Sequence, residues 1–267
     1  MPEELEVVLY AHPQRLREAE KIAQRFNLPL ATGQGKNKYK LYLGPEKLEL
    51  HCLHDAAIKP LSIDFTRGRS RYRRLWGGGR NQPLAKAAGI KGSWRPAILD
   101  ATAGFGRDAL VLAGLGCRVT LLERSPVLAA LLADALARAS LHTETMEIAA
   151  RINLHCIDAL TYLKSPVPAD APDTIYLDPM YPHRSKTALV KKEMRIARDL
   201  AGDDNDAAQL LEQALKQPVK RIVVKRPQHA EQLGRQKADA AVNSKNTRYD
   251  IYFPGHTIDR REHAPDR

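Results

Sequence analysis

The chain contains the stretch Ile98-Leu99-Asp100-Ala101-Thr102-Ala103-Gly104-Phe105-Gly106-Arg107-Asp108, in which an apolar strand ends in a carboxylate and a glycine-rich turn leads into a helix. Gly104 and Gly106 can adopt backbone conformations that a side chain would forbid, and they let a ligand approach the backbone closely. The first turn of the helix that follows offers free N–H groups. The stretch therefore predicts a ligand-binding turn at the start of an α/β domain.

Short apolar runs alternate with helical segments after this turn. We expect strands at 97–100, 118–123, 153–158, 174–178, 221–225, 240–243 and 248–253, and helices at 107–115, 126–140, 186–199 and 206–216. Alternation of this kind implies right-handed βαβ units and a mostly parallel, doubly wound sheet. The predicted fold class is therefore α/β, with a Rossmann-like domain at 97–254.

Three other segments flank this domain. Residues 1–66 show the patterns of a strand, of an amphipathic helix at 13–26, of a hairpin around Gly44 and of a further strand at 61–66, which together predict a small N-terminal α+β unit. Residues 67–96 form a basic, Gly/Arg-rich connecting segment. Residues 255–267 are polar, and we expect them to be a loose tail.

The glycine turn fits two kinds of cofactor. Gly104, Gly106 and Ala109 match a G-x-G-x-x-A form of the dinucleotide-binding fingerprint. The carboxylate of Asp100 favours S-adenosylmethionine instead, because it would repel a pyrophosphate and attract the ammonium group of an amino acid. The turn alone leaves both cofactors open, and Asp100 shifts the prediction to S-adenosylmethionine.

Acidic residues also end the next two predicted strands. Glu123 is suited to accept hydrogen bonds from both hydroxyls of a ribose, which NAD and S-adenosylmethionine share. Asp158 is placed to meet an adenine amine. Any one of these acids could simply cap a helix. Three acids at successive strand ends, on the side where open α/β sheets bind ligands, predict a nucleoside site.

The segment Ile175-Tyr176-Leu177-Asp178-Pro179-Met180-Tyr181-Pro182-His183 follows another apolar strand. It is similar to the [DN]-P-P-[FYW] signature of amino-methyltransferases, with Met180 at the second proline position. An exocyclic base amine is a poor nucleophile, because its lone pair is delocalised into the ring. Acceptors at the Asp178 carboxylate and the Pro179 carbonyl would orient this amine, and Tyr181 would stack on the base. Asp178, Pro179 and Tyr181 are therefore the predicted catalytic residues.

With both motifs in place, the chain resembles the ribosomal RNA small-subunit methyltransferase J family from about residue 60 to 253, whereas the first 60 residues match only loosely. The matching stretches are Arg73-Arg74, Gly77-Gly78-Gly79-Arg80, Ala85-Lys86-Ala87, Gly89-Ile90-Lys91-Gly92, Asp100-Ala101-Thr102-Ala103-Gly104, Gly106-Arg107-Asp108, Gly116-Cys117-Arg118-Val119, Leu122-Glu123-Arg124, Tyr176-Leu177-Asp178-Pro179-Met180, Ser185-Lys186, Ala188-Leu189-Val190-Lys191-Lys192-Glu193-Met194-Arg195 and Val223-Val224-Lys225-Arg226-Pro227.

The resemblance implies a class I methyltransferase that uses S-adenosylmethionine to methylate N2 of one guanosine near the 3′ end of 16S rRNA in the small ribosomal subunit. It also implies that Met180 is a feature of the family. By motif, cofactor contacts would come from Arg107-Asp108, Glu123-Arg124, Asp158-Ala159 and Asp178, in addition to Asp100, Gly104 and Gly106.

Positive charge supports a nucleic-acid partner. The net charge is +11, and the segment 65–99 holds nine basic residues and no acid. Such a charge favours polyanions through steering and counterion release, although a charge run is often only a solvated surface. The predicted RNA-binding residues are Arg67, Arg69, Arg71, Arg73, Arg74, Arg80, Lys191 and Lys192. Lys225 and Arg226 could serve either RNA or structural pairing.

Other features set limits on location and metal binding. No run of about 18 apolar residues is present, and residues 1–6 lack an export signal, so we expect a cytoplasmic protein with no membrane partner. The three cysteines lack CxxC spacing, which predicts free thiols. His51, Cys52 and His54 have no fourth ligand at a suitable spacing, so no metal site is expected.

Three alternatives stay open at this stage. The first is an amino-methyltransferase that acts on another RNA or on adenine or cytosine in DNA. The second is an NAD-dependent oxidoreductase, which Asp100 and Asp178 disfavour. The third is a catalytically silent RNA-binding or ribosome-assembly protein, which the complete set of acids disfavours.

Overall fold

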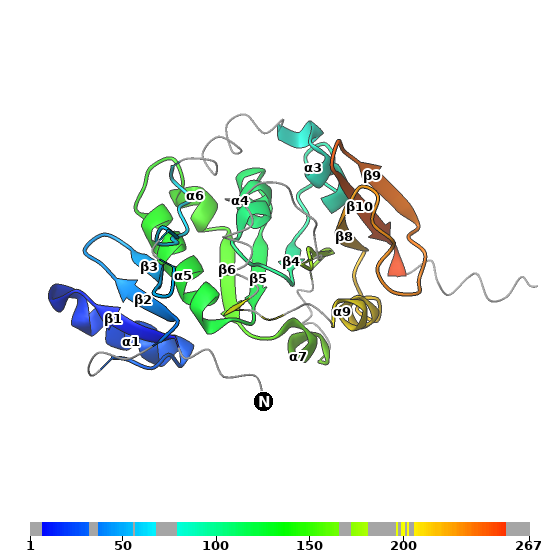
Figure 1. Cartoon of the computed structure of the whole chain (residues 1–267). Coiled ribbons are helices and arrows are strands. Elements are labelled where there is room, and N and C mark those ends of the chain that lie inside the picture. Colours follow the sequence, from blue (N-terminus) through cyan, green and yellow to red (C-terminus); the bar gives the residue numbers. More distant parts are fainter. Residues whose placement is uncertain are drawn as a thin grey trace, which may run out of the picture.

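A seven-stranded sheet forms the centre of the computed structural model, which describes residues 7–31, 37–55, 57–67, 79–165, 172–180, 196, 199–200, 202 and 206–254 (Figure 1). The strand order is β6-β5-β4-β7-β8-β10-β9, and the strands are β4 (Ile98–Asp100), β5 (Val119–Glu123), β6 (Ile152–Cys156), β7 (Thr174–Leu177), β8 (Arg221–Pro227), β9 (Ala240–Asn243) and β10 (Thr247–Tyr252). Neighbours from β6 to β8 are parallel, and β10 pairs antiparallel with both β8 and β9. The predicted mostly parallel sheet is confirmed.

Helices pack on both faces of this sheet because its central strands bury both of their faces; every residue of β4 and β7 is buried. One face is covered by α4 (Arg107–Gly114) and α5 (Pro126–Ser140), and the other by α7 (Ala159–Leu163) and α9 (Ala207–Ala214). Two further short helices lie in the described part of the chain, α3 (Pro83–Ala88) and α6 (Met146–Ala149). The side chain of Ser125 caps the N-terminus of α5 by accepting a hydrogen bond from Leu128 N–H, and Pro126 is the first residue of the helix, where its missing N–H costs nothing.

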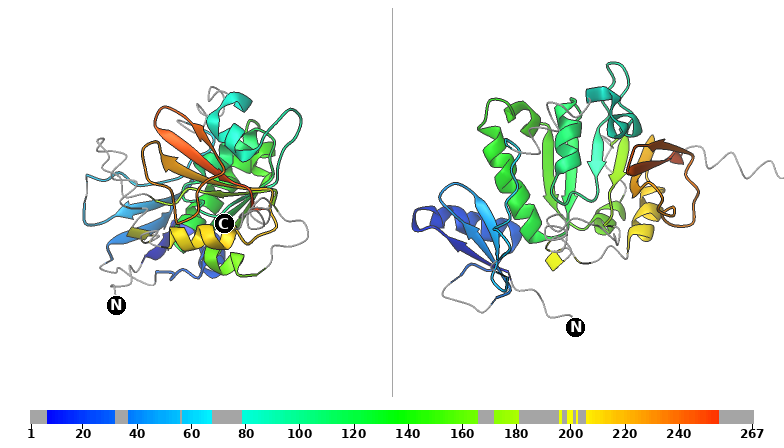
Figure 2. Two further views of the ribbon diagram at one scale, coloured as in Figure 1. Left: turned by 90° about the vertical axis from the view of Figure 1, so that its right-hand side faces the viewer. Right: turned by 45° about the horizontal axis from the view of Figure 1, so that its top comes forward.

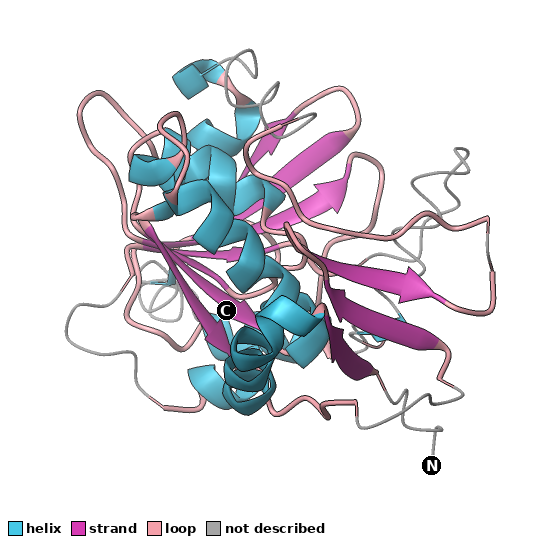
Figure 3. Cartoon of the chain, turned by 90° about the vertical axis from the view of Figure 1, so that its left-hand side faces the viewer, coloured by secondary structure: helices cyan, strands magenta, loops and turns pink. Residues whose placement is uncertain are grey.

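A three-stranded sheet makes up the N-terminal unit. Its strands are β1 (Val8–Ala11), β2 (Tyr39–Leu43) and β3 (Leu48–Cys52), with β1 parallel and β3 antiparallel to the central β2. A 3₁₀ turn, η1 (Pro13–Arg15), leads into α1 (Leu16–Phe26). Both α1 and β3 pack against α5, so α5 lies between the two sheets, as Figures 1 and 3 show. The N-terminal unit thus lies at the β6 end of the large sheet, opposite the β9–β10 end (Figure 2).

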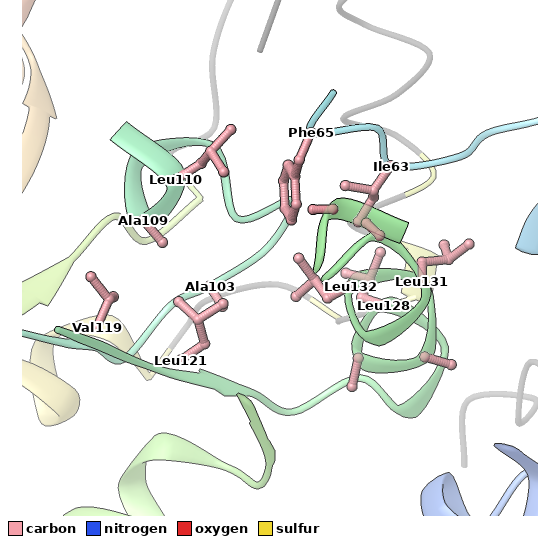
Figure 4. Packing of buried hydrophobic residues seen from close by; sticks show 14 of the residues in the cluster. Ile63, Phe65, Ala103, Ala109, Leu110, Val119, Leu121, Leu128, Leu131 and Leu132 are labelled. Carbon is pink, nitrogen blue, oxygen red and sulfur yellow. The ribbon is translucent and has the colours of Figure 1, made fainter. Parts of the chain in front are cut away.

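The prediction of a strand at 61–66 is wrong. Only an isolated bridge between Leu50 and Leu61 forms there, and Ile63 and Phe65 instead bury their side chains in the core beside α5 (Figure 4). The alternating apolar residues of this segment are therefore buried as the pattern indicates, but they do not form a strand. Within 67–96, η2 (Gly79–Asn81) and α3 are regular, and α3 buries Leu84.

Most of the helix predicted at 186–199 lies outside the described residues. Among those that are described, no helix has the length and apolar character needed to cross a bilayer.

Candidate cofactor and catalytic site

The glycine turn follows the carboxyl end of β4. Gly104 and Gly106 have φ values of +52° and +65°, which the sequence pattern anticipated, and Gly106 is the N-cap residue of α4. A Cβ atom at Gly106 would lie 2.8 Å from Leu132 Cδ2, whereas one at Gly104 would lie 3.9 Å from Thr102 O and meet nothing nearer among the described residues. Gly106 therefore permits close packing against α5.

Asp100 ends β4 inside the fold, with 2% of its surface exposed. The Thr102 N–H donates to Asp100 Oδ1 at 3.1 Å. Burial raises the pKa of Asp100 to about 8; the Thr102 N–H and the charge of Lys225 oppose this rise, while the charges of Asp108 and Asp178 add to it. A buried carboxyl among other acids favours binding of a positively charged group.

Glu123, at the end of β5, ties the next strand to the glycine turn. It is 5% exposed, and its two carboxylate oxygens accept hydrogen bonds from Gly104 N–H at 2.9 Å and from Ser125 N–H at 2.8 Å. The structure therefore brings Glu123 to the turn, as predicted from its place at a strand end. Arg124, beside it, forms an ion pair with Asp206 at 3.2 Å.

Asp158 lies beyond the end of β6 and caps α7. Its Oδ2 accepts a hydrogen bond from Thr161 N–H at 2.8 Å, and Ala159 is the first residue of the helix. The capping role that the sequence left open for this acid is thus observed. Contact of Asp158 and Ala159 with an adenine ring stays a prediction.

The first two residues of α4 point to different surroundings. Arg107 is exposed, and its guanidinium lies 5.0 Å from the ring centre of Phe105. Asp108 is buried, and its Oδ2 accepts hydrogen bonds from Tyr176 OH and Lys225 Nζ, each at 2.7 Å. Asp108 therefore belongs to an internal polar network, and its contact with the cofactor stays a prediction.

Asp178 follows β7 directly and lies next to the glycine turn. Its backbone N–H donates to Thr102 Oγ1 at 2.6 Å, and its Oδ2 accepts from Lys225 Nζ at 2.7 Å. The side chain is 38% exposed, whereas Pro179 is buried. The first two predicted catalytic residues thus lie at the carboxyl edge of the sheet beside Asp100. The third, Tyr181, lies outside the described residues.

The comparisons with known proteins agree with this geometry. The family described as "Putative SAM-dependent methyltransferase" matches residues 21–254. The chain is 48% identical to the ribosomal RNA small subunit methyltransferase J of Thioalkalivibrio sulfidiphilus over 93% of this chain and 97% of that protein. It is 49% identical to the protein of the same name from Nitrosococcus oceani, over 90% and 95% of the two chains. The chain belongs to the ribosomal RNA small subunit methyltransferase J family.

A solved structure supports the same assignment. A SAM-dependent methyltransferase from Neisseria gonorrhoeae superposes with a TM-score of 0.76 at 33% identity, covering 97% of this chain and 100% of that one. The Rossmann-like class I fold, the enzyme class and S-adenosylmethionine as the cofactor are therefore confirmed, and the NAD-dependent alternative is excluded.

The residues present fit this cofactor. Its amino-acid part carries an ammonium group, which suits the buried carboxyl of Asp100, and its ribose hydroxyls suit the carboxylate of Glu123. Among the described residues, a Cβ atom at Gly104 would meet nothing nearer than 3.9 Å, which leaves room there for a ligand against the backbone. When bound, S-adenosylmethionine supplies an electrophilic methyl group.

Thr102 and Tyr176 were not predicted as site residues, although Thr102 lies in the glycine turn and Tyr176 lies two residues before Asp178. Lys225 was predicted to serve either RNA or structural pairing. Its signals in the sequence are its place in the family-like stretch Val223-Val224-Lys225-Arg226-Pro227 and the buried apolar residues before it, Ile222-Val223-Val224. Of the two roles left open for Lys225 and Arg226, structural pairing is observed for both, because Arg226 donates to Glu231 O at 2.9 Å.

The structure tests little of the predicted RNA surface. Arg67 is exposed. The side chain of Arg80 and the whole of Arg69, Arg71, Arg73, Arg74, Lys191 and Lys192 lie outside the described residues.

Proposed function

We propose that this protein transfers a methyl group to the exocyclic N2 amine of one guanosine near the 3′ end of 16S rRNA in the small ribosomal subunit. The observation that carries the proposal is the Asp178-Pro179 turn at the carboxyl edge of the sheet, beside the glycine turn and held by Thr102 and Lys225. The names of the relatives from Thioalkalivibrio sulfidiphilus and Nitrosococcus oceani support a ribosomal RNA substrate.

The chemistry of the turn suits an exocyclic amine. The N2 group of guanine has two N–H donors, and its lone pair is delocalised into the ring. The Asp178 carboxylate and the Pro179 carbonyl would each accept one of these hydrogen bonds, which favours a pyramidal nitrogen directed at the methyl group. After transfer, the nitrogen loses one proton to Asp178 or to water. Tyr181 would stack on the base and hold it away from its neighbours.

The cofactor would be held from three strand ends. We assign the ammonium group to Asp100, close backbone approach to Gly104 and Gly106, and the ribose to Glu123 and Arg124. Arg107, Asp108, Asp158, Ala159 and Asp178 complete the proposed set. The burial of Asp100 and Glu123 at one edge of the sheet supports this assignment.

RNA would be bound by basic residues on both sides of the catalytic turn in the sequence. Arg67, Arg69, Arg71, Arg73, Arg74 and Arg80 precede it, and Lys191 and Lys192 follow it. Phosphate contacts of this kind position the substrate without reading its sequence. We propose that residues 67–96 make much of this contact with RNA. They connect an N-terminal unit (1–66) to the methyltransferase domain (97–254), and 255–267 form a tail. We also propose that the protein acts in the cytoplasm.

The test is transfer of labelled methyl groups to small ribosomal subunits from cells that lack this gene, followed by digestion of the RNA to nucleosides. We expect label in N2-methylguanosine at one site near the 3′ end of 16S rRNA. Label in another nucleoside would contradict the substrate assignment. Absence of label in any RNA or DNA, although the cofactor binds, would contradict the proposed reaction.

A further inference from the structure

Four polar side chains form a continuous hydrogen-bond network beside the Asp178-Pro179 turn. Tyr176 OH and Lys225 Nζ both donate to Asp108 Oδ2 at 2.7 Å, and Lys225 Nζ also donates to Asp178 Oδ2 at 2.7 Å. These residues come from β7, α4, β8 and the turn after β7. These hydrogen bonds therefore connect the first turn of α4 with Asp178, the proposed acceptor of the base amine.

We propose that Lys225 is a positioning residue for methyl transfer, which holds the Asp178 carboxylate ionised and in one orientation while a base amine is presented to it. The inference rests on the proposed function, since it takes Asp178 as the acceptor of that amine. Lys225 would act only through Asp178 and would not touch the substrate.

The exposure of these groups supports a role in which the buried end of the network holds the exposed carboxylate of Asp178. The Tyr176–Asp108 end lies inside the fold, where Asp108 is 7% exposed, whereas the side chain of Asp178 is 38% exposed at the other end. The side chain of Lys225, 27% exposed, lies between them. A lysine that served RNA phosphates would extend toward solvent, but the ammonium group of Lys225 lies against two carboxylates.

Charge balance gives the reason for a lysine at this position. The charges of Asp108 and Asp178 both add to the burial that raises the pKa of Asp100, and the charge of Lys225 opposes this rise. Burial alone would lower the pKa of Lys225, but the Asp178 and Asp108 carboxylates raise it above its ordinary value, so the side chain stays charged. Without this cation the repulsion between the acids would favour protonation of Asp178, which makes the carboxyl a weaker acceptor for the amine and leaves it unable to take up the proton that the amine loses.

Rigid supports fix the ammonium group itself. Lys225 lies in β8, which pairs with β7 on one side and β10 on the other. The hydroxyl of Tyr176 shares Asp108 Oδ2 with Lys225, and its pKa is raised well above its ordinary value by burial and by Asp108, so it stays protonated as a donor. An ammonium group anchored in this way can define the position of a more exposed carboxylate.

The test compares Lys225→Met with Lys225→Arg and with a control, Lys220→Met, across pH 6–9. Lys220 is also an ion-paired lysine, 2.8 Å from Asp173, but its side chain is 69% exposed and its partner precedes β7, whereas Asp178 follows β7. We measure single-turnover methyl transfer to gene-deficient small subunits, S-adenosylmethionine affinity by calorimetry, and titration of the Asp178 carboxyl by ¹³C NMR in the cofactor-free protein.

We expect Lys225→Met to slow transfer by about 100-fold near pH 7 while the cofactor still binds. The acid limb of its rate profile and the Asp178 titration should both move up by about 1–3 pH units. Lys225→Arg should restore the pH profile and part of the rate, because it keeps the charge in a different shape. Lys220→Met should match the unmodified protein. An unchanged pH profile and an unchanged Asp178 titration in Lys225→Met would overturn the inference.

A second variant covers the case in which Lys225→Met does not fold. Lys225→Gln removes the charge but keeps an amide that can still donate a hydrogen bond, so fewer polar groups are left without a partner than in Lys225→Met. We expect it to fold and to show the shifted pH profile, because all the acids are kept and the cation is lost. If its profile matches that of the unmodified protein, the role of Lys225 is only structural and the inference is wrong.

Asp178→Ala separates this inference from the proposed function. If Asp178→Ala transfers methyl groups at a near-normal rate, the proposed chemistry at Asp178 fails, and the role of Lys225 fails with it. If Asp178→Ala is inactive but Lys225→Met keeps the normal rate and pH profile, only the role of Lys225 is refuted.

Discussion

Replacing Gly106 by alanine should destabilise the glycine turn through two separate costs. The first is conformational, because Gly106 has φ +65°, and a residue with a side chain loses about 1–2 kcal/mol in this left-handed region. The second is steric, because the added Cβ would lie 2.8 Å from Leu132 Cδ2 and 3.1 Å from Phe65 Cζ. Both neighbours are buried in the core beside α5 (Figure 4), so they have little room to shift. Overpacking of this kind costs about 1–3 kcal/mol.

The sum is about 2–5 kcal/mol, which corresponds to a fall in melting temperature of about 4–20 °C for a chain of this size. The matched control is Gly92→Ala. Gly92 has φ +53°, but a Cβ built there meets no described residue within 4 Å, so the expected cost is the conformational one. Thermal unfolding followed by circular dichroism measures the difference between the two variants. If Gly106→Ala melts at the same temperature as Gly92→Ala, the steric part of the reasoning is refuted.

Three further predictions concern the site. Asp178→Ala should abolish methyl transfer while the fold and its melting temperature persist; a folded variant with near-normal transfer would contradict the mechanism. Because the pKa of Asp100 is raised to about 8 by burial, among Asp108, Asp178 and Lys225, binding of a cationic ligand should release a proton below that pH, and affinity for S-adenosylmethionine should rise from pH 6 to 8 and then level off. Calorimetry in buffers of different ionisation enthalpy checks this, and Asp100→Asn should remove the proton release; equal release by that variant would place the titrating group elsewhere. Reversal of Arg71, Arg73 and Arg74 to glutamate should weaken RNA binding and lower its salt dependence without changing cofactor affinity; filter binding at several salt concentrations measures it, and unchanged RNA affinity would place the RNA surface elsewhere.

The alternation of apolar runs and helical segments was sufficient to predict the parallel sheet, because each buried strand shows as a short apolar run between polar segments. The same pattern failed at 61–66. Ile63 and Phe65 alternate with polar residues as they would in a strand, but they are buried in the core beside α5 and have no neighbouring strand among the described residues. Local patterns report burial and cannot report which partner provides it.

The residues of the candidate site also fall into those that the sequence could predict and those that it could not. Asp100, Glu123 and Asp178 could be predicted because the carboxyl ends of parallel strands meet at one edge of the sheet. The role of Lys225 could not, since its partners lie 47 and 117 positions away in the chain. Asp158 shows a further limit, because a strand-end acid and a helix cap look alike in sequence, and this residue caps α7.

The most direct test of the central claim uses a small subunit in which the target guanosine, once mapped, is replaced by inosine. Inosine lacks the exocyclic N2 amine and is otherwise the same base. The account predicts methyl transfer to the guanosine subunit and none at that position of the inosine subunit, with equal binding of the protein to both. Methylation of the inosine subunit at that position would show that another atom accepts the methyl group, and it would contradict the role assigned to Asp178 and Pro179.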